Sequence, residues 1–263
     1  MTSSAIARLF AERTAEGRAA LVPYVTAGFP PGVSTVAVLE ALADAGADII
    51  ELGIPFSDPL ADGPTIQRSS FLALEAGMTV AGVLDILRSF RASRETPVVL
   101  FTYLNPVMHY GMREFCRDAR DAGAQGLLLT DLPVGSDPDV EAVAGEVGLD
   151  LIRLLAPTTP PERIPEVARG ATGFLYYISR TGVTGAREGL RDDLEREVRA
   201  VKARVDLPVA VGFGISGPDQ ARSVAAVADG VVVGSALVQI LEDEGIDGAA
   251  RFVAALRRAM DGG

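Results

Sequence analysis

The stretch from Asp44 to Asp62, DAGADIIELGIPFSDPLAD, contains the pattern that decides the fold. Its first residues place a glycine where a helix would end, and two isoleucines then begin an apolar segment of strand length. Glu51 follows at once, and the loop after it carries two more carboxylates, Asp58 and Asp62. An unpaired charge at the end of a buried strand costs several kcal/mol, so this acid needs a partner or a function.

Short apolar or β-branched runs of this kind recur along the whole chain, separated by segments with helical spacing. A glycine again stands between a helix and a strand at 121–125, 146–150 and 227–231. Continuous apolar strands that alternate with helices predict a parallel sheet covered on both faces. The predicted strands are 21–26, 48–52, 98–103, 126–130, 149–154, 174–178, 209–212 and 230–233.

Eight such units in roughly 250 residues match an α/β fold of the closed (β/α)8 type, the TIM barrel. An open, doubly wound sheet is the alternative, but no Gly-x-Gly-x-x-Gly follows the first predicted strand. The chain shows no linker and no break in composition. The sequence therefore predicts a single catalytic barrel domain over residues 1–263, capped by an extra helix around residues 6–10.

The composition excludes several classes of partner. The net charge of -11 argues against nucleic acid and anionic membranes, both of which require a basic surface. No apolar run reaches the roughly 18 residues of a membrane span, and the first residues do not resemble a signal peptide. A single cysteine, Cys116, permits no internal disulfide and favours the cytoplasm.

Barrel enzymes place their active sites at the carboxyl ends of the strands. Glu51 and Tyr103 end the second and third predicted strands, Asp131 follows the fourth, and Tyr176 lies in the sixth. All five tyrosines are predicted in strands or in the loop after the third strand, with none on a helix. Apart from Tyr177, which should face away from the barrel interior, they favour a flat apolar ligand; the others are Tyr24, Tyr103, Tyr110 and Tyr176.

Glycine-containing turns follow each of the last three strands, at 182–185, 212–216 and 234–235. Glycine lets backbone N–H groups approach an anion, and a helix N-terminus adds favourable partial charge. Barrel enzymes often bind phosphate in these loops. The sequence therefore predicts a phosphate site held by backbone dipoles.

A phosphate site in a barrel indicates sugar-phosphate chemistry, by isomerisation, aldol cleavage or decarboxylation. A Schiff-base aldolase requires a lysine at a strand end, but the only lysine, Lys202, precedes the seventh strand. A metal-dependent aldolase requires several histidines, and His109 is the only one, so no metal site is predicted. A substrate cleaved here must accept the electrons of the broken bond itself.

Glu51 is the predicted acid–base group, since burial against an apolar wall raises the pKa of a carboxyl group. The alternative for Glu51 is a structural acid paired with an arginine. Asp62 is placed to accept a hydrogen bond from a ligand N–H. The alternative for Asp58 and Asp62 is that they cap turns.

Residues 51–67, ELGIPFSDPLADGPTIQ, closely resemble the signature of the tryptophan synthase alpha-chain family. The resemblance covers the full chain in the family's order. It includes LVPYVTAGFP at 21–30, DLP at 131–133, SRTGVTGA at 179–186, VGFGIS at 211–216 and VVGSALV at 232–238.

The resemblance implies a carbon–carbon lyase of tryptophan biosynthesis that cleaves indole-3-glycerol phosphate, the phosphorylated indole substrate, to indole and glyceraldehyde 3-phosphate. By position, Glu51 would protonate C3 of the indole ring and take the side-chain hydroxyl proton, Asp62 would hold the indole N–H, and Tyr176 would be the active-site tyrosine. The implied substrate-binding residues are Tyr24, Phe101 and Tyr103 in the pocket wall, with Thr184, Gly185, Phe213, Gly214, Gly234 and Ser235 in the phosphate loops.

The family also implies a partner, the beta chain, in an alpha2-beta2 heterotetramer. Asp58, Asp131 and Pro133 resemble the residues that communicate with it. Pyridoxal phosphate would belong to that partner, and no cofactor is expected in this chain. Two alternatives stay open: a stand-alone indole-releasing lyase, and a catalytically idle barrel with a regulatory role.

Overall fold

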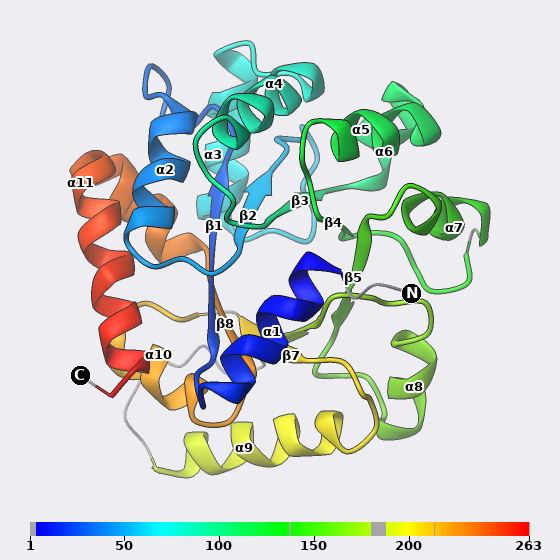
Figure 1. Ribbon diagram of the computed structural model, residues 1–263, viewed down its shortest axis with the longest axis vertical. Coiled ribbons are helices and arrows are strands. Elements are labelled where there is room, and N and C mark those ends of the chain that lie inside the picture. Colours follow the sequence, from blue (N-terminus) through cyan, green and yellow to red (C-terminus); the bar gives the residue numbers. More distant parts are fainter. Residues whose placement is uncertain (1–3, 137, 180–187, 213, 263) are drawn as a thin grey trace.

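A closed barrel of eight parallel strands forms the centre of the computed structural model (Figure 1). The structure describes residues 4–136, 138–179, 188–212 and 214–262; for residues 139 and 188–193 it describes the backbone only. Each strand pairs with the next in sequence and β8 closes on β1, which confirms the TIM barrel. The strands are β1 (Ala20–Thr26), β2 (Ile50–Gly53), β3 (Val98–Thr102), β4 (Gly126–Leu129), β5 (Asp150–Leu155), β6 (Leu175–Ile178), β7 (Val209–Gly212) and β8 (Gly230–Val233).

All eight strands were predicted, with ends that differ by two residues at most. Glu51 is the clearest shift, because β2 continues past it to Gly53. The helices are α1 (Ala5–Ala15), α2 (Thr35–Asp44), α3 (Pro64–Glu75), α4 (Val80–Arg91), α5 (Leu104–Tyr110), α6 (Met112–Asp121), α7 (Pro138–Glu146), α8 (Ile164–Val167), α9 (Glu188–Lys202), α10 (Pro218–Ala225) and α11 (Ser235–Met260), with a short 3-10 helix at Pro161–Arg163.

Two local predictions were wrong. Tyr110 lies at the end of α5, a helix that the sequence did not suggest, and its hydroxyl donates to Asp118 on α6. Gly230 does not cap a helix but begins β8, where an added Cβ would lie 3.0 Å from Ala210 and 3.3 Å from Phe10. The other three glycines of that pattern, Gly46, Gly123 and Gly148, do have positive φ after a helix, as a C-cap requires.

Helix α1 closes the amino end of the barrel, as the sequence predicted (Figure 1). Its N-cap is Ser4, whose side chain accepts the Ala7 N–H. Ile6 and Phe10 pack against the inward-facing residues at the start of the strands, with the Phe10 and Phe174 rings 5.4 Å apart. The carboxyl end of the barrel is therefore the open end.

The main core lies between the barrel and its surrounding helices, and Cys116 is buried there on α6. Among the described helices, none is by itself long and apolar enough to cross a membrane. Helices α3 and α4 pass that test of length and composition together, but a bend of 97° separates them. Both bury one face inside the protein, through residues such as Ala73 and Leu87.

Arg257 ties the C-terminal helix to the amino end of the barrel. Its guanidinium donates to Asp48 at 3.0 Å and to the Ala19 carbonyl at 3.1 Å, and it also contacts Asp261. Asp48 in turn accepts the Leu21 N–H of β1. The group is largely buried, so each polar atom depends on its partner.

We expect Arg257→Met to lower the free energy of unfolding by about 3 kcal/mol, because it leaves Asp48 buried beside one fewer cation. Chemical denaturation measures this loss. Arg88→Met is the control, since Arg88 pairs with Asp85 at 2.6 Å on an exposed face of α4 and should contribute less than about 1 kcal/mol. Equal effects of the two substitutions would contradict the assignment.

Candidate active site

The inward-facing residues near the carboxyl end of the barrel bring the predicted catalytic groups together. The strand register sets Tyr24 of β1 beside Glu51 of β2, and Glu51 beside Val99 of β3. Parallel strands present register partners to the same face, so these side chains form one layer inside the barrel. Glu51 is 1% exposed.

The Glu51 carboxyl group is buried, and one of its oxygens has no partner among the described residues. Its Oε1 accepts no hydrogen bond, and no ion pair joins Glu51 to an arginine within the described chain. The alternative of a structural acid paired with an arginine finds no such arginine among the described residues. Burial raises the pKa of Glu51 to about 8, so near neutral pH the group holds a proton and can donate it.

Asp62 stands in the loop between β2 and α3, and burial raises its pKa to about 6. A hydrogen bond from Tyr103 partly offsets that rise. The Tyr103 hydroxyl also accepts the Ala61 N–H at 3.0 Å, so Tyr103 fixes both the loop and the acid. Its ring packs on Phe56 of the same loop, with centroids 5.3 Å apart. The sequence predicted Tyr103 as pocket wall and missed this contact with Asp62.

Two further tyrosines share the electrostatic environment of these acids. Burial raises the pKa of Tyr24 and of Tyr176, and the charges of Glu51 and Asp62 raise both further. Both phenols therefore stay neutral. Tyr177 faces outward, as predicted, and its hydroxyl donates to Glu197 at 2.8 Å. Tyr110, by contrast, contacts α6 through Asp118, so it does not belong to the ligand-facing set.

Glycines on the strands let two of these rings enter the barrel. A Cβ on Gly53 would lie 2.2 Å from the Tyr24 hydroxyl, and one on Gly212 would lie 2.3 Å from the Tyr176 hydroxyl. No real Cβ tolerates such a contact, so any other residue displaces the ring. Gly53 was not predicted as a site residue, although a glycine inside a strand indicates a close approach of this kind.

A buried row of hydroxyl groups supports the Tyr24 side of the site. Tyr24 and Thr26 hydroxyls lie 3.3 Å apart, and those of Thr26 and Ser69 lie 2.7 Å apart. Ser69 donates to the Ile66 carbonyl of α3. An apolar cluster covers this row, formed by Tyr24, Phe29, Ile66 and Val238 with Leu72 and Phe101 at its edge. Sequence reasoning missed Thr26 and Ser69, because nothing in the pattern shows that they meet.

The predicted phosphate loops are partly described. Gly214 has a φ of +76° and is exposed after β7. Gly234 is the N-cap of α11, which is kinked at Gly245, and the first turn of α11, beginning at Ser235, receives no side-chain cap. Those N–H groups point where an anion is stabilised. Thr184, Gly185 and Phe213 lie outside the described residues.

The predicted partner-facing residues lie in loops around the same end. Asp58, Asp131 and Pro133 are exposed, and Asp131 accepts the Leu104 N–H at the start of α5. Within the described parts of the chain, no group of three or more His, Cys, Asp or Glu residues is arranged to hold a metal ion.

Comparison with known proteins agrees with this arrangement. The sequence profile of the family described as tryptophan synthase alpha chain matches residues 10–261. The tryptophan synthase alpha chain of Geobacter sulfurreducens is 50% identical over 262 residues, covering 98% of this chain and 99% of the relative. That of Burkholderia thailandensis is 50% identical over 264 residues, covering 98% and 97%.

Two solved structures are similar along their whole length. Tryptophan synthase subunit alpha from Legionella pneumophila superposes with a TM-score of 0.91 at 38% identity, covering 99% of this chain and 100% of the other. A chain of Mycobacterium tuberculosis tryptophan synthase gives 0.90 at 39% identity, covering 98% and 99%.

Fold and site together define a (β/α)8-barrel enzyme that carries a protonated carboxyl group at its open end. The chain belongs to the tryptophan synthase alpha-chain family. It is a carbon–carbon lyase, and its function is the cleavage of indole-3-glycerol phosphate in tryptophan biosynthesis.

We expect Glu51→Gln to stabilise the protein increasingly as pH rises. The folded pKa of about 8 exceeds the ordinary 4.5, so burial of Glu51 costs little below pH 4.5 and progressively more between 4.5 and 8. Above pH 8 the variant should be more stable by on the order of 5 kcal/mol, since each pKa unit is worth about 1.4 kcal/mol. Denaturation across pH 5–9 measures the difference, with Glu75→Gln as an exposed control. A difference independent of pH would refute the shift.

Proposed function

We propose that Glu51 is the acid–base group of the cleavage reaction. Its burial at the open end of the barrel carries this assignment, because Oε1 has no hydrogen-bond partner among the described residues and the carboxyl group holds a proton near neutral pH. General acid–base groups work best when their pKa lies near the operating pH.

The chemistry balances without a further reactant. Protonated Glu51 gives its proton to C3 of the indole ring, which leaves a cationic, iminium-like ring. The resulting carboxylate takes the proton of the hydroxyl group on the adjacent side-chain carbon. As that oxygen forms a carbonyl, the C–C bond breaks and its electron pair neutralises the ring. The products are indole and glyceraldehyde 3-phosphate, and Glu51 is protonated again.

Asp62 is proposed to accept the indole N–H. A carboxylate there stabilises the positive charge that develops on the ring nitrogen after C3 is protonated. The pKa of about 6 keeps Asp62 largely ionised at neutral pH while Glu51 remains protonated. Two carboxyl groups in one site thus take opposite roles because their environments separate their pKa values. Tyr103 acts as a positioning residue through its hydrogen bond to Asp62.

The aromatic residues are proposed to bind the indole ring. Tyr24 and Phe101 meet edge to face, with centroids 5.2 Å apart, and belong to the apolar cluster at the mouth. Tyr176 enters from the opposite side of the barrel on β6. We propose that the phosphate binds to Gly214, Gly234 and Ser235, together with the undescribed Thr184, Gly185 and Phe213.

A tryptophan synthase beta chain is the proposed partner, in an alpha2-beta2 heterotetramer. Asp58, Asp131 and Pro133 are exposed around the open end, and Leu60 in the same loop as Asp58 is 90% exposed although apolar. Met108 on α5 is also an exposed apolar residue. Exposed apolar side chains beside polar ones are typical of a protein-binding surface.

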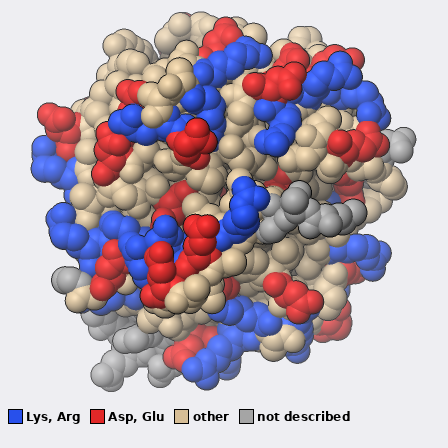
Figure 2. Space-filling model, viewed as in Figure 1, with Lys and Arg blue, Asp and Glu red and all other residues tan. Residues whose placement is uncertain are grey.

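The remaining assignments follow the family. We propose a single catalytic domain over residues 1–263 in the cytoplasm, without a cofactor of its own, and with pyridoxal phosphate in the beta chain. Nucleic acid and membranes are not proposed as partners, because the net charge is -11. On the face that Figure 2 shows, basic side chains are interspersed with acidic ones.

We expect Glu51→Gln to reduce indole release from indole-3-glycerol phosphate by at least about 100-fold, because the amide can neither give nor take the proton. Indole is measured with the purified chain, alone and with added beta chain. Glu75→Gln, an exposed acid at the end of α3, is the matched control and should retain full turnover.

The same assay separates the alternatives. Slow indole release that rises strongly when the beta chain is added supports the proposed catalytic subunit. Fast indole release that does not change when the beta chain is added supports a stand-alone lyase. No release in either case supports an idle barrel. Near-normal turnover of Glu51→Gln would remove Glu51 from the mechanism.

The dependence of kcat/KM on pH should be bell-shaped, rising near pH 6 as Asp62 ionises and falling near pH 8 as Glu51 loses its proton. Tyr103→Phe removes a hydrogen bond that lowers the pKa of Asp62. We therefore expect this variant to move the acidic limb to higher pH and leave the basic limb in place. If the variant loses activity at every pH while both limbs of the kcat/KM profile stay in place, Tyr103 does not set the pKa of Asp62 and its contact has only a structural role.

A further inference from the structure

One arginine is buried on the outer face of the barrel wall. Arg153 lies on β5 and is 4% exposed. Its neighbours in the strand, Ile152 and Leu154, pack inside the barrel, so the side chain of Arg153 points outward to the surrounding helices. Its register partner on β6, Leu175, is apolar and fully buried. A guanidinium group among such residues needs an explanation, because burial of its charge is costly.

The guanidinium group of Arg153 contacts both α7 and the loop that precedes it. Its Nη1 donates to the Leu132 carbonyl at 3.4 Å, and its Nη2 lies 2.9 Å from Oε1 of Glu141 on α7. Neither Nε nor Nη2 makes a hydrogen bond of good geometry to a described residue. Two packed apolar side chains would stabilise a fold as well as such a buried ion pair does. Stability alone therefore does not account for the pair.

Glu141 extends the contact into the loop between β4 and α7. The same Oε1 accepts the Gly135 N–H at 2.7 Å, and Gly135 has a φ of +73°, which glycine adopts readily. The side chain of Leu132 is buried in the main core. The backbone of this loop is thus held from within at two points, by Arg153 at the Leu132 carbonyl and by Glu141 at the Gly135 N–H.

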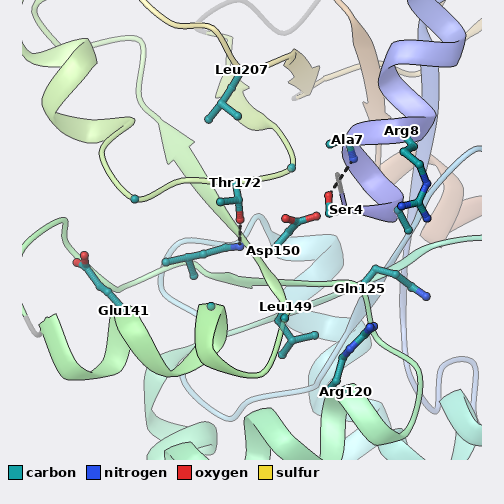
Figure 3. A pocket seen from close by; sticks show the side chains of 16 residues that line it. Ser4, Ala7, Arg8, Arg120, Gln125, Glu141, Leu149, Asp150, Thr172 and Leu207 are labelled. Atoms are coloured by element: carbon teal, nitrogen blue, oxygen red, sulfur yellow. Dashed lines mark hydrogen bonds between the residues drawn. The ribbon is translucent and has the colours of Figure 1, made fainter. Parts of the chain in front are cut away.

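Glu141 also lines a cavity of about 720 Å³ at the amino end of the barrel, and Asp150 lines the same cavity (Figure 3). In Figure 3 the carboxyl groups of Glu141 and Asp150 lie well apart. Arg153 is not among the lining residues. The Arg153–Glu141 pair is therefore separate from Asp150 and directed to the loop.

The outer side of the same loop carries Asp131 and Pro133, which are both exposed. Asp131 also accepts the Leu104 N–H at 2.7 Å, which joins the loop to α5 and its exposed Met108. A loop that is held in one conformation binds a partner at a lower entropic cost than a loop that must first be ordered. Contacts on the inner side of this loop therefore affect what its outer side can bind.

We propose that Arg153 and Glu141 are positioning residues, which hold the β4–α7 loop in the conformation that binds the beta chain. This inference rests on the proposed beta-chain partner. Arg153 faces away from the barrel interior that contains Glu51, so the pair acts on partner binding and not on cleavage by the chain alone.

We expect Arg153→Met to weaken binding of a tryptophan synthase beta chain about 10-fold, a usual size for coupling between separate sites. Isothermal titration calorimetry measures the affinity. Hydrogen exchange of the Gly135 amide should become faster, because Glu141 loses the cation that holds it in place. Indole release by the chain alone should stay unchanged. Arg88→Met is the matched control and should alter none of these, since Arg88 pairs with Asp85 on an exposed face of α4.

A double variant separates positioning from stability. Arg153→Met alone should lower the melting temperature, because it leaves Glu141 without its cation, whereas Arg153→Met combined with Glu141→Met should restore it. The double variant still lacks both contacts to the loop, so its binding of the beta chain should stay weak. Recovery of beta-chain binding together with the melting temperature would overturn the inference, because the pair would then act through stability only.

The wild-type chain distinguishes this inference from the proposed function. Failure of the wild-type chain to bind the beta chain would overturn the proposed partner and this inference together. Wild-type binding that Arg153→Met does not weaken would overturn this inference alone.

Discussion

A proton held inside an apolar barrel is the constraint on which this active site depends. Glu51 occupies a position that most barrels fill with a branched apolar side chain, and its Oε1 has no hydrogen-bond partner in the described structure. Such a group is tolerable only when it is neutral, so the fold itself sets the protonation state that the reaction needs. An arginine beside it would have stabilised the fold and removed the acid.

The side chains around Glu51 also keep charge away from its carboxyl group. Tyr24 and Tyr176 bring polar atoms close to Glu51 without bringing charge, and glycines at 53 and 212 provide the space for their hydroxyl groups. The charge of Asp62 is placed in the following loop, where Tyr103 and partial exposure keep its pKa lower. The degree of burial, with the Tyr103 hydrogen bond to Asp62, thus decides which carboxyl group is an acid and which is an anion.

Much of this was predictable from sequence because the decisive signals are local. Apolar runs and glycine caps repeat with each strand–helix unit, so the eight strands were found to within two residues. Glu51 was found because a carboxylate directly after two isoleucines of a buried strand is energetically costly and therefore needs a function. The contacts between distant segments were not found, among them Thr26 with Ser69 and Tyr103 with the loop of Asp62. Tyr110 was misplaced because a seven-residue helix with an internal proline has little periodicity of its own.

The two ends of the barrel show how one fold can treat two similar acids differently. Glu51 and Asp150 both lie on strands, both are buried, and both have an oxygen without a partner. At the carboxyl end, helix N-termini and glycine turns supply N–H donors, which suits a phosphate beside Glu51. At the amino end, helices α6 and α7 finish, and their carbonyl groups favour cations, one of which is Arg120 in the last turn of α6. The polarity that every βα unit imposes therefore favours anions at one end of the barrel and cations at the other, while α1, which enters the amino end by its own N-terminus, is the local exception.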